Sequence, residues 1–571
     1  MVKLIVVSGG VISGVGKGIA TASIGKILQE YGFSVTAVKI DPYLNYDAGT
    51  LRPTEHGEVW VTDDGGEIDQ DLGNYERFLG FQISRRNNIT TGQVYKEIID
   101  KERRGEFLGQ TISPFPFIPN EIKSRVKECA RRPDGGEYDF VIVEIGGTIG
   151  DYENAPFLFA MKSFEIELGK DSVTNMLVSY LPVPPNVGEM KTKPTQQAIR
   201  MLNEHGIFPD FVLCRSTEPL DDVRKKKIET YANIPSDHII SAPDIKSVYR
   251  VPLNFESQNL GYKLMKLMNV MPRATPDWSK WKELVENIEN PSRSVKVAMV
   301  GKYVSTGNFN LSDSYISINS ALSHAGANLG VGIDIDWIDS GKFDNGGSDV
   351  LDGYDGVIIP GGFGGSGVEG KINSIRHARE NGTPFLGLCY GMQLAIIEFA
   401  RNVCGMEGAH TTEVDPQARY PVIDVLPSQK AILKNKEYGG TMRLGAYAAV
   451  LEKSKVLDAY SSGRMKTDMK IAGLIRKSSP FRLGILNEGE PFVLERHRHR
   501  YEVAPKFIDA LKKGGLVFPG FHRRDDGANL MEFIELPEHP FFVATQAHPE
   551  FKSRLDDTAP LFLEFVRACV D

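Results

Sequence analysis

The chain is poor in cysteine and has no long hydrophobic run. Its 571 residues contain five cysteines, none in a C-x-x-C pair, which argues against a disulfide framework or a Cys-rich zinc site and for a reducing cytoplasm. No apolar run approaches the roughly 20 residues of a membrane span. The N-terminal MVKLIVVSGG lacks a small-residue cleavage site, so we expect no signal peptide. The net charge of −8 gives no support for nucleic acid or an anionic membrane as a partner.

Internal repeats are also absent, and two series of apolar, β-branched runs organise the chain. Such runs, alternating with helix-like stretches, predict α/β units with parallel sheets covered on both faces. The first series ends near residue 270, and the second begins at VKVAMVGKY. Pro- and Ser-punctuated sequence around one short amphipathic helix lies between them and predicts a linker. We therefore expect two doubly wound, mostly parallel α/β domains, with boundaries at 1–270, 271–294 (the linker) and 295–571.

A glycine-rich segment follows the first apolar run. Residues 9–18 read GGVISGVGKG between a strand-like and a helix-like stretch, which is the context of a phosphate-binding loop. The loop is irregular, because Val11 stands at the first Gly position and Gly18 replaces the Ser or Thr whose hydroxyl binds Mg²⁺. If the loop binds ATP, oxygen ligands from elsewhere must hold the metal.

Two carboxylates are candidates for that role. Glu144 ends an apolar run at the sheet edge where α/β proteins bind ligands, and a buried carboxylate is costly there unless it is paired or binds a metal. Asp71 lies among several acids, which alone would more simply form a solvated loop. Lys17 and Lys39 carry charges that suit phosphates.

A second anion site is indicated further along the chain. Lys191 and Lys193 precede Pro194 and a helix start, and two ammonium groups with helix N–H groups suit a triphosphate distinct from ATP. Lys227 lies in a lysine run that alone would more simply be a charged helix face.

The C-terminal half carries the pattern of a cysteine nucleophile. Cys389 lies in G-x-C-x-G between a strand-like and a helix-like segment, and a helix N-terminus favours thiolate. His548 and Glu550 are two residues apart, so on an extended segment the carboxylate can orient the imidazole. Each residue alone is more often structural, but the combination indicates nucleophilic catalysis. The Gly361–Gly362 turn offers N–H groups for an oxyanion.

The segments GLCYGMQ, PGGFG and HPEF resemble class I glutamine amidotransferase domains, which hydrolyse glutamine through a thioester and release ammonia. The resemblance implies that Cys389 is the nucleophile, His548 the base and Glu550 its orienting partner. An Arg guanidinium suits the α-carboxylate of glutamine because it binds in a bidentate fork. The glutamine-binding residues implied are Gly361, Gly362, Tyr390, Gly391, Met392, Gln393, Glu413 and Arg500.

Together with GGVISGVGKG, HGEVWVTDDGGEIDQDLGNYERF, EIGGTIGD and KTKPTQ, these motifs make essentially the whole chain resemble the CTP synthase family. The resemblance implies a dethiobiotin-synthetase-like P-loop amidoligase domain before the amidotransferase domain. In that family ATP phosphorylates O4 of UTP, and ammonia from glutamine displaces the phosphate to give CTP. The resemblance also implies that Mg²⁺ is bound with ATP, that GTP is an allosteric activator, that CTP is a feedback inhibitor and that the protein is a homotetramer.

The same resemblance assigns nucleotide sites. The ATP-binding residues implied are Gly14, Val15, Gly16, Lys17, Gly18, Ile19, Lys39, Asp71, Asp244 and Ile245, and the Mg²⁺ ligands are Asp71 and Glu144. The UTP- and CTP-binding residues implied are Ser13, Asp151, Tyr152, Glu153, Lys191, Thr192, Lys193, Pro194, Thr195, Gln196 and Lys227.

The sequence departs from the family pattern at three positions. Ser366 stands where the family usually carries Arg, so we expect weakened activation by GTP. Phe117 replaces a usual His, and Tyr231 a frequent Phe, so we expect inhibition by CTP to differ.

Two alternatives stay open at this point. One is a different amidoligase of the same architecture, such as a cobyrinic-acid amide synthetase, which would not be expected to carry KTKPTQ. The other is a nucleotide-sensing scaffold that forms filaments without catalysis. The presence of Cys389, His548, Glu550 and Lys17 argues against loss of catalysis.

Overall fold

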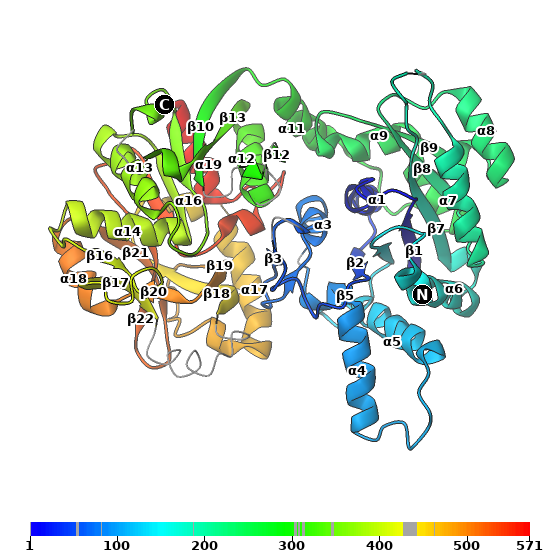
Figure 1. Ribbon diagram of the computed structural model, residues 1–571, viewed down its shortest axis with the longest axis horizontal. Helices are drawn as coiled ribbons and strands as arrows, with labels where there is room; N and C mark the ends of the chain where they lie inside the picture. The colour runs from blue at the N-terminus through cyan, green and yellow to red at the C-terminus, as the bar shows by residue number, and fades with distance from the viewer. Residues whose placement is uncertain are drawn as a thin grey trace. The chain divides into compact units, whose positions relative to one another are not determined.

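The structure is a computed structural model that forms two compact units (Figure 1). It describes residues 2–52, 56–81, 83–186, 188–301, 305–306, 309–310, 315–343, 348–425, 442–461 and 463–571. Unit 1 comprises Met1–Leu51 and Glu67–Val285, and unit 2 comprises Arg52–Gly66 and Glu286–Asp571. This division differs from an unbroken first domain over 1–270, because residues 52–66 belong to the second unit.

Unit 1 is built on a seven-stranded sheet of order β5-β2-β6-β1-β7-β8-β9. Each neighbouring pair of strands is parallel. The strands of unit 1 are β1 (Lys3–Gly9), β2 (Val35–Asp41), β4 (Glu67–Ile68), β5 (Asn88–Thr90), β6 (Phe140–Ile145), β7 (Val173–Tyr180), β8 (Phe211–Ser216) and β9 (Ile239–Pro243). Every position of β2 and β6 is buried, as expected for a parallel sheet covered on both faces.

Helices cover the two faces of this sheet. The α-helices of unit 1 are α1 (Lys17–Glu30), α3 (Asp71–Leu79), α4 (Thr91–Arg103), α5 (Pro114–Cys129), α6 (Ala155–Leu168), α7 (Lys193–Glu204), α8 (Asp222–Ala232), α9 (Val251–Ser257) and α10 (Leu260–Leu267). The predicted amphipathic helix between the two series is α11 (Ser279–Glu289), which buries Trp281, Leu284 and Val285. The division between the units falls within α11.

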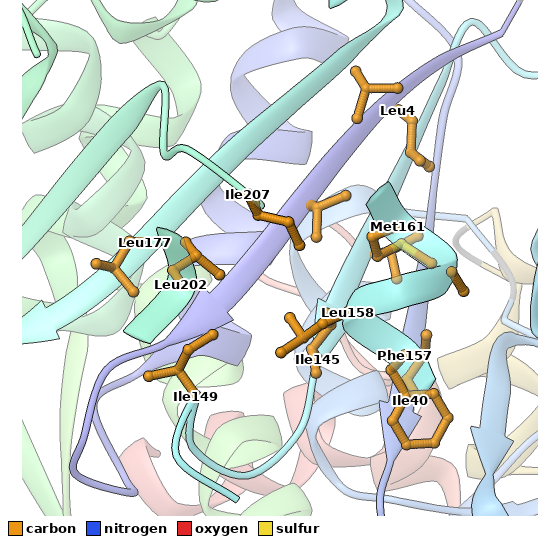
Figure 2. Close-up of a cluster of buried hydrophobic side chains, with 14 of the residues drawn as sticks. Leu4, Ile40, Ile145, Ile149, Phe157, Leu158, Met161, Leu177, Leu202 and Ile207 are labelled. Atoms are coloured by element: carbon orange, nitrogen blue, oxygen red, sulfur yellow. The ribbon is translucent and has the colours of Figure 1, made fainter. Parts of the chain in front are cut away.

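The core on one side of the sheet joins its strands to α6 and α7. Figure 2 shows the buried side chains of Leu4, Ile40, Ile145, Ile149, Phe157, Leu158, Met161, Leu177, Leu202 and Ile207. Burying a side chain of this kind contributes roughly 1.5–3 kcal/mol. Successive strand residues point to opposite faces, so Ile145 packs in this core while Glu144 faces the other side, toward α1 and α3.

Unit 2 is built on a nine-stranded sheet of order β13-β10-β14-β15-β23-β22-β21-β18-β19. Pairs from β13 to β23 are parallel, and pairs from β23 to β19 are antiparallel. The strands of unit 2 are β3 (Trp60–Val61), β10 (Arg293–Gly301), β11 (Ser305–Thr306), β12 (Phe309–Asn310), β13 (Val331–Asp339), β14 (Gly356–Ile359), β15 (Phe385–Leu388), β16 (Ala409–Thr411), β17 (Tyr420–Val425), β18 (Arg443–Leu451), β19 (Phe492–His499), β20 (Tyr501–Val503), β21 (Val517–Arg523), β22 (Asn529–Glu535) and β23 (Phe542–Thr545).

Helices pack on both faces of this second sheet. The α-helices of unit 2 are α12 (Ile316–Leu329), α13 (Val368–Asn381), α14 (Tyr390–Asn402), α16 (Lys455–Tyr460), α17 (Arg464–Ser478), α18 (Pro505–Lys513) and α19 (Pro560–Val570). One core contains side chains of α13 and α14, and another contains those of α12, α16 and α19. The α/β prediction is confirmed for both units. The antiparallel half was not predicted, because β19 and β22 bury charged residues such as Glu495, Arg496 and Glu532 and so lack the apolar runs that mark parallel strands.

No helix in the described part of the chain is both long and apolar enough to cross a membrane.

Candidate active sites

The glycine-rich loop leads directly into α1. Gly14 and Gly16 have φ values of 71° and 81°, in the left-handed region that favours glycine. Gly16 is the N-cap residue of α1. The Lys17 ammonium donates a hydrogen bond to the carbonyl oxygen of Gly147 at 2.6 Å. The loop and the helix N-terminus therefore have the arrangement that binds phosphate groups in other proteins.

Gly18 stands where a standard phosphate loop carries a hydroxyl. A Cβ atom on Gly18 would lie 2.7 Å from Oδ1 and 3.0 Å from Cγ of Asp71. The Asp71 carboxylate therefore fills the space that a serine or threonine side chain would need. The glycine and the carboxylate are complementary, because only a residue without Cβ lets Asp71 approach the loop so closely.

Four carboxylates surround the ammonium group of Lys39. Its Nζ contacts Asp71 most closely and lies within 3.7 Å of oxygens of Asp41, Asp69 and Glu144. Lys39 and Glu144 are register partners on β2 and β6. In this structure the charge of Lys39 is therefore balanced by carboxylates of its own unit, which sequence reasoning did not foresee.

The electrostatics of this cluster follow from burial and from Lys39. Burial raises the pKa of Glu144 above its ordinary value and raises the pKa of Asp41 to about 7. Burial also opposes ionisation of Asp71, yet Lys39 holds the pKa of Asp71 below its ordinary value. Asp71 is therefore charged at neutral pH and available to a cation.

The residues present fit a magnesium ion. Glu144 is fully buried, its Oε2 accepts a hydrogen bond from the Tyr75 hydroxyl, and its Oε1 accepts none in the described residues. Mg²⁺ is usually bound by one or two carboxylates with water and phosphate oxygens. Within the described ranges no group of three or more His, Cys, Asp or Glu side chains is placed to hold a metal.

A cavity of about 230 Å³ lies beside the loop. The sequence-predicted ATP-site residues that line it are Gly16, Ile19, Asp244 and Ile245. Arg215 also lines it, and its guanidinium forms an ion pair of 2.6 Å with Asp244. Sequence reasoning missed Arg215, whose only signal is an arginine at the end of the apolar run DFVLCR.

The second predicted anion site surrounds the start of α7. Thr192 is the N-cap residue of this helix, and the buried Thr195 hydroxyl accepts a hydrogen bond from Ser179 at 2.9 Å. Lys191 Nζ lies 3.0 Å and Lys227 Nζ 4.0 Å from carboxylate oxygens of Glu189. Lys191 and Lys227, two of the three predicted lysines, thus share the carboxylate of Glu189.

An open hollow of about 790 Å³ adjoins α7 and α8. Gln196, Lys227 and Tyr231 contribute to its walls. The structure therefore brings two of the predicted UTP-site residues together with Tyr231, one of the positions at which the sequence departs from the family. Phe117 packs instead against the core of unit 1, with its ring centroid 5.2 Å from that of Phe107.

The predicted residues at 151–153 lie after β6. Asp151 Oδ2 accepts a hydrogen bond from the Thr148 N–H at 2.6 Å, so this carboxylate orders the turn that follows the strand. Tyr152 is 85% exposed, and Glu153 is also exposed. Asp151 therefore has a local structural role, whereas its two neighbours face solvent in the single chain. Ser13 is likewise exposed, in the glycine-rich loop.

Cys389 occupies a strained turn between β15 and α14. Its φ and ψ are 49° and −99°, a backbone conformation that is costly for a residue with a side chain. Its N–H donates to the Thr545 carbonyl oxygen at 2.7 Å. A Cβ atom on Gly391 would lie 2.2 Å from the Ile359 carbonyl oxygen. This close approach explains why a glycine stands two residues after Cys389.

His548 lies next to Cys389 and is held by Glu550. Its Nδ1 is 2.6 Å from Glu550 Oε1. A Cβ atom on Gly361 would lie 2.8 Å from His548 Cε1, so only glycine leaves room for the ring. Burial alone would lower the pKa of His548, but Glu550 and Cys389 raise it well above its ordinary value. The imidazole is therefore suited to take the thiol proton.

Three predicted glutamine-site residues gather at the glycine-rich turn after β14. Glu413 Oε1 accepts a hydrogen bond from the Gly364 N–H at 3.0 Å, and the Tyr390 hydroxyl donates to the Gly364 carbonyl oxygen at 2.9 Å. Burial raises the pKa of Glu413, and the charge of Arg500 acts in the opposite direction. These contacts join Glu413 and Tyr390 to the same turn, and the charge of Arg500 lies close enough to act on Glu413. Gly362, in the same turn, is exposed.

Two other predicted glutamine-binding side chains are used for packing. Met392 is fully buried in the core that contains α14. Gln393 Nε2 donates to the Tyr501 carbonyl oxygen at 3.1 Å and to Gln546 Oε1 at 3.2 Å. The Met392 side chain and the Gln393 amide nitrogen therefore already have partners within unit 2.

Sequence reasoning also missed groups around the sulfur. Gln546 Nε2 lies 3.7 Å from Cys389 Sγ, and the Arg498 carbonyl oxygen lies 3.9 Å from it. For Gln546, the sequence signal was its position two residues before His548. The sequence carries no signal for the Arg498 carbonyl group, because its position depends on the register of β19.

Comparison with known proteins identifies the class to which these two units belong. Residues 3–270 match the family model "CTP synthase N-terminus", and residues 310–568 match "Glutamine amidotransferase class-I". The chain is thus a glutamine-hydrolysing ligase.

Full-length relatives then give the family. CTP synthase of Pyrococcus furiosus is 48% identical over 568 residues, and CTP synthase of Thermococcus gammatolerans is 47% identical over 568 residues. Each alignment covers 100% of this chain and 98% of the relative. The chain belongs to the CTP synthase family. Among solved structures, the glutaminase domain of Trypanosoma brucei CTPS with bound acivicin is 31% identical, with coverage of 48% of this chain and 94% of its own, at a TM-score of 0.39.

Proposed function

We propose that this chain converts UTP to CTP in two chemical steps carried out by its two units. Unit 1 activates O4 of UTP with the γ-phosphate of ATP, and unit 2 releases ammonia from glutamine. Phosphorylation is needed because a uracil carbonyl oxygen leaves poorly, whereas phosphate leaves readily. The observation that carries this division is the Gly18–Asp71 arrangement in unit 1 together with the Cys389–His548–Glu550 arrangement in unit 2.

In unit 1 the chain's own groups bind and orient ATP. The N–H groups at the start of α1 and the Lys17 ammonium bind the phosphates, and the cavity lined by Arg215, Asp244 and Ile245 receives the adenine. Asp71 and Glu144 would hold Mg²⁺, which when bound neutralises charge on the phosphates. The lysines around the start of α7 and Lys227 bind the triphosphate of UTP.

In unit 2 the Cys389 thiolate attacks the side-chain carboxamide of glutamine, and His548 carries the thiol proton. That proton goes to the leaving nitrogen as the thioester forms, so ammonia departs. Glu550 holds the imidazole in orientation through Nδ1. Water then hydrolyses the thioester to glutamate with His548 as the base.

Conversion of UTP to CTP tests the proposal directly. We expect absorbance changes due to CTP when the protein is supplied with ATP, Mg²⁺ and either glutamine or ammonium chloride. If folded protein forms CTP with ammonium chloride but not with glutamine, the proposed role of unit 2 is contradicted. If it forms CTP with neither nitrogen source, the proposal as a whole is contradicted. Family membership and the assembled catalytic groups argue against a different amidoligase and against a scaffold without catalysis.

Activation by GTP is expected to be weak. Ser366 is exposed just before α13, where it offers no charge to an anionic nucleotide. A Ser366→Arg variant is expected to raise the stimulation of glutamine-dependent CTP formation by GTP roughly 10-fold, the worth of one hydrogen bond between charged groups. Rates with and without GTP measure this, with ammonia-dependent rates as the control. Strong stimulation of the unaltered protein would contradict the expectation.

Other expectations from the family stay predictions. They are a homotetramer, feedback inhibition by CTP altered at Phe117 and Tyr231, and a cytoplasmic location. Sedimentation with and without nucleotides tests the first, and a CTP inhibition curve tests the second.

A further inference from the structure

Residues 56–66 come from the N-terminal half of the chain but pack within unit 2. Their strand β3 packs against β19 (Figure 1). The Asp63 carbonyl oxygen accepts hydrogen bonds from the Ala446 N–H at 2.9 Å and from the Arg482 guanidinium at 2.6 Å. A Cβ atom on Gly445 would lie 2.6 Å from that same oxygen. The segment is therefore tightly docked on β18, the strand next to β19.

A charged contact joins this segment to the strand beside the catalytic residues. Asp63 Oδ1 accepts a hydrogen bond from Arg496 Nε at 2.5 Å, and Arg496 is 1% exposed. Despite the burial of Asp63, the guanidinium lowers its pKa to about 2. A buried pair of this kind holds its partners firmly, because separating them would leave an uncompensated buried charge.

Arg496 and Arg498 in turn contact both catalytic residues through their backbone. The carbonyl oxygen of Arg496 accepts the hydrogen bond from the His548 N–H at 2.8 Å. Two residues further along β19, the carbonyl oxygen of Arg498 lies 3.9 Å from Cys389 Sγ. The position of β19 thus sets the positions of groups at both the imidazole and the thiol.

A second path runs through aromatic rings. Trp60 is 1% exposed, and its ring centroid lies 5.1 Å from that of Phe551. The Phe551 ring stacks on the His548 imidazole with centroids 5.2 Å apart and an interplanar angle of 23°. Trp60 therefore packs against the aromatic ring that stacks on the His548 imidazole.

We propose that Asp63 and Trp60 are positioning residues for His548, so that a segment of the N-terminal half completes the glutaminase site. Asp63 acts through Arg496 on the backbone of His548, and Trp60 acts through Phe551 on its ring. Neither residue touches glutamine or the reacting atoms. Their role is to keep the imidazole where it can exchange a proton with Cys389.

Asp63→Asn in the full chain is the test. The substitution keeps the shape and a hydrogen-bond acceptor but removes the charge that holds Arg496. We expect kcat for glutamine hydrolysis to fall roughly 10- to 100-fold, the effect of a small misplacement of a catalytic group. KM for glutamine and the rate of ammonia-dependent CTP formation are expected to stay within about 2-fold. Alkylation of Cys389 by iodoacetamide, measured by mass spectrometry, is expected to slow in parallel with kcat.

Asp64→Asn is the matched control, because Asp64 lies in the same turn but its carboxylate accepts a hydrogen bond from Thr62. It is expected to change none of these rates by more than about 2-fold. If Asp63→Asn does not fold, Trp60→Phe tests the proposal instead. We expect this substitution to lower kcat for glutamine hydrolysis roughly 3- to 10-fold. Glutaminase kcat within 2-fold of the unaltered protein in a folded variant, or an equal loss of ammonia-dependent activity, would overturn the proposal.

Discussion

Cys389→Ala is expected to abolish glutamine-dependent CTP formation and leave ammonia-dependent CTP formation unchanged. Removing the nucleophile of a comparable catalytic group costs roughly 10⁴- to 10⁶-fold in kcat, so activity with glutamine should fall below detection. Unit 1 contains the proposed nucleotide sites and does not need the thiol. Parallel assays with glutamine and with ammonium chloride measure the two activities separately.

Cys404→Ala is the matched control for this experiment. Cys404 is a second free cysteine of unit 2. It lies two residues after the end of α14, and its Sγ is 3.8 Å from the Ala510 carbonyl oxygen. Both activities should survive its removal. Loss of ammonia-dependent CTP formation in Cys389→Ala would show that the two units do not divide the reaction as proposed.

Gly18→Ala is expected to lower CTP formation from both nitrogen sources by about 100-fold, because a misplacement of about 1 Å at a catalytic group has an effect of this size. The new Cβ would lie 2.7 Å from Asp71 Oδ1, so the carboxylate must move away from the loop. Gly18→Ser, which restores the hydroxyl-bearing residue of the standard loop, is expected to lose activity for the same reason. Steady-state kinetics with varied ATP and Mg²⁺ measure the loss.

Gly473→Ala controls for the general effect of replacing a helical glycine. Gly473 lies in α17, and a Cβ there would meet nothing within 4 Å. We expect full activity and a free energy of unfolding raised by about 0.5–1 kcal/mol. An active Gly18→Ala enzyme with unchanged kinetics would contradict the view that Asp71 replaces the missing hydroxyl.

Local sequence patterns were sufficient for the elements of each site. The apolar runs that became β1, β6 and β15 are buried on both faces, and such runs stand out in any sequence. Residues close together in the chain, such as the 9–18 loop or the pair His548 and Glu550, keep their spacing whatever the rest of the fold does. Their proximity could therefore be predicted before the structure was known.

Contacts between distant residues could not be read in this way. The Asp63–Arg496 pair joins positions 433 residues apart, and the arginine stands in an alternating basic run that resembles an exposed strand. The antiparallel strands β19 and β22 were missed because they bury charged residues such as Glu495 and Glu532 and so lack apolar runs. In the sequence, Gly18 was only a departure from the standard phosphate-loop pattern. The structure shows that the Asp71 carboxylate occupies the space that a side chain at position 18 would need.

The sequence by itself thus determined the two α/β units and led to the predictions of a phosphate loop and of Cys389 as a nucleophile with His548 and Glu550, because these depend on residue types at short spacing. Only the tertiary structure decided that Asp71 fits against Gly18, that Lys39 is surrounded by carboxylates, and that residues 56–66 pack into unit 2. These features arise from close packing between segments far apart in the chain. The residue pattern and the spacing within one segment do not specify which distant backbone or side-chain groups that segment contacts.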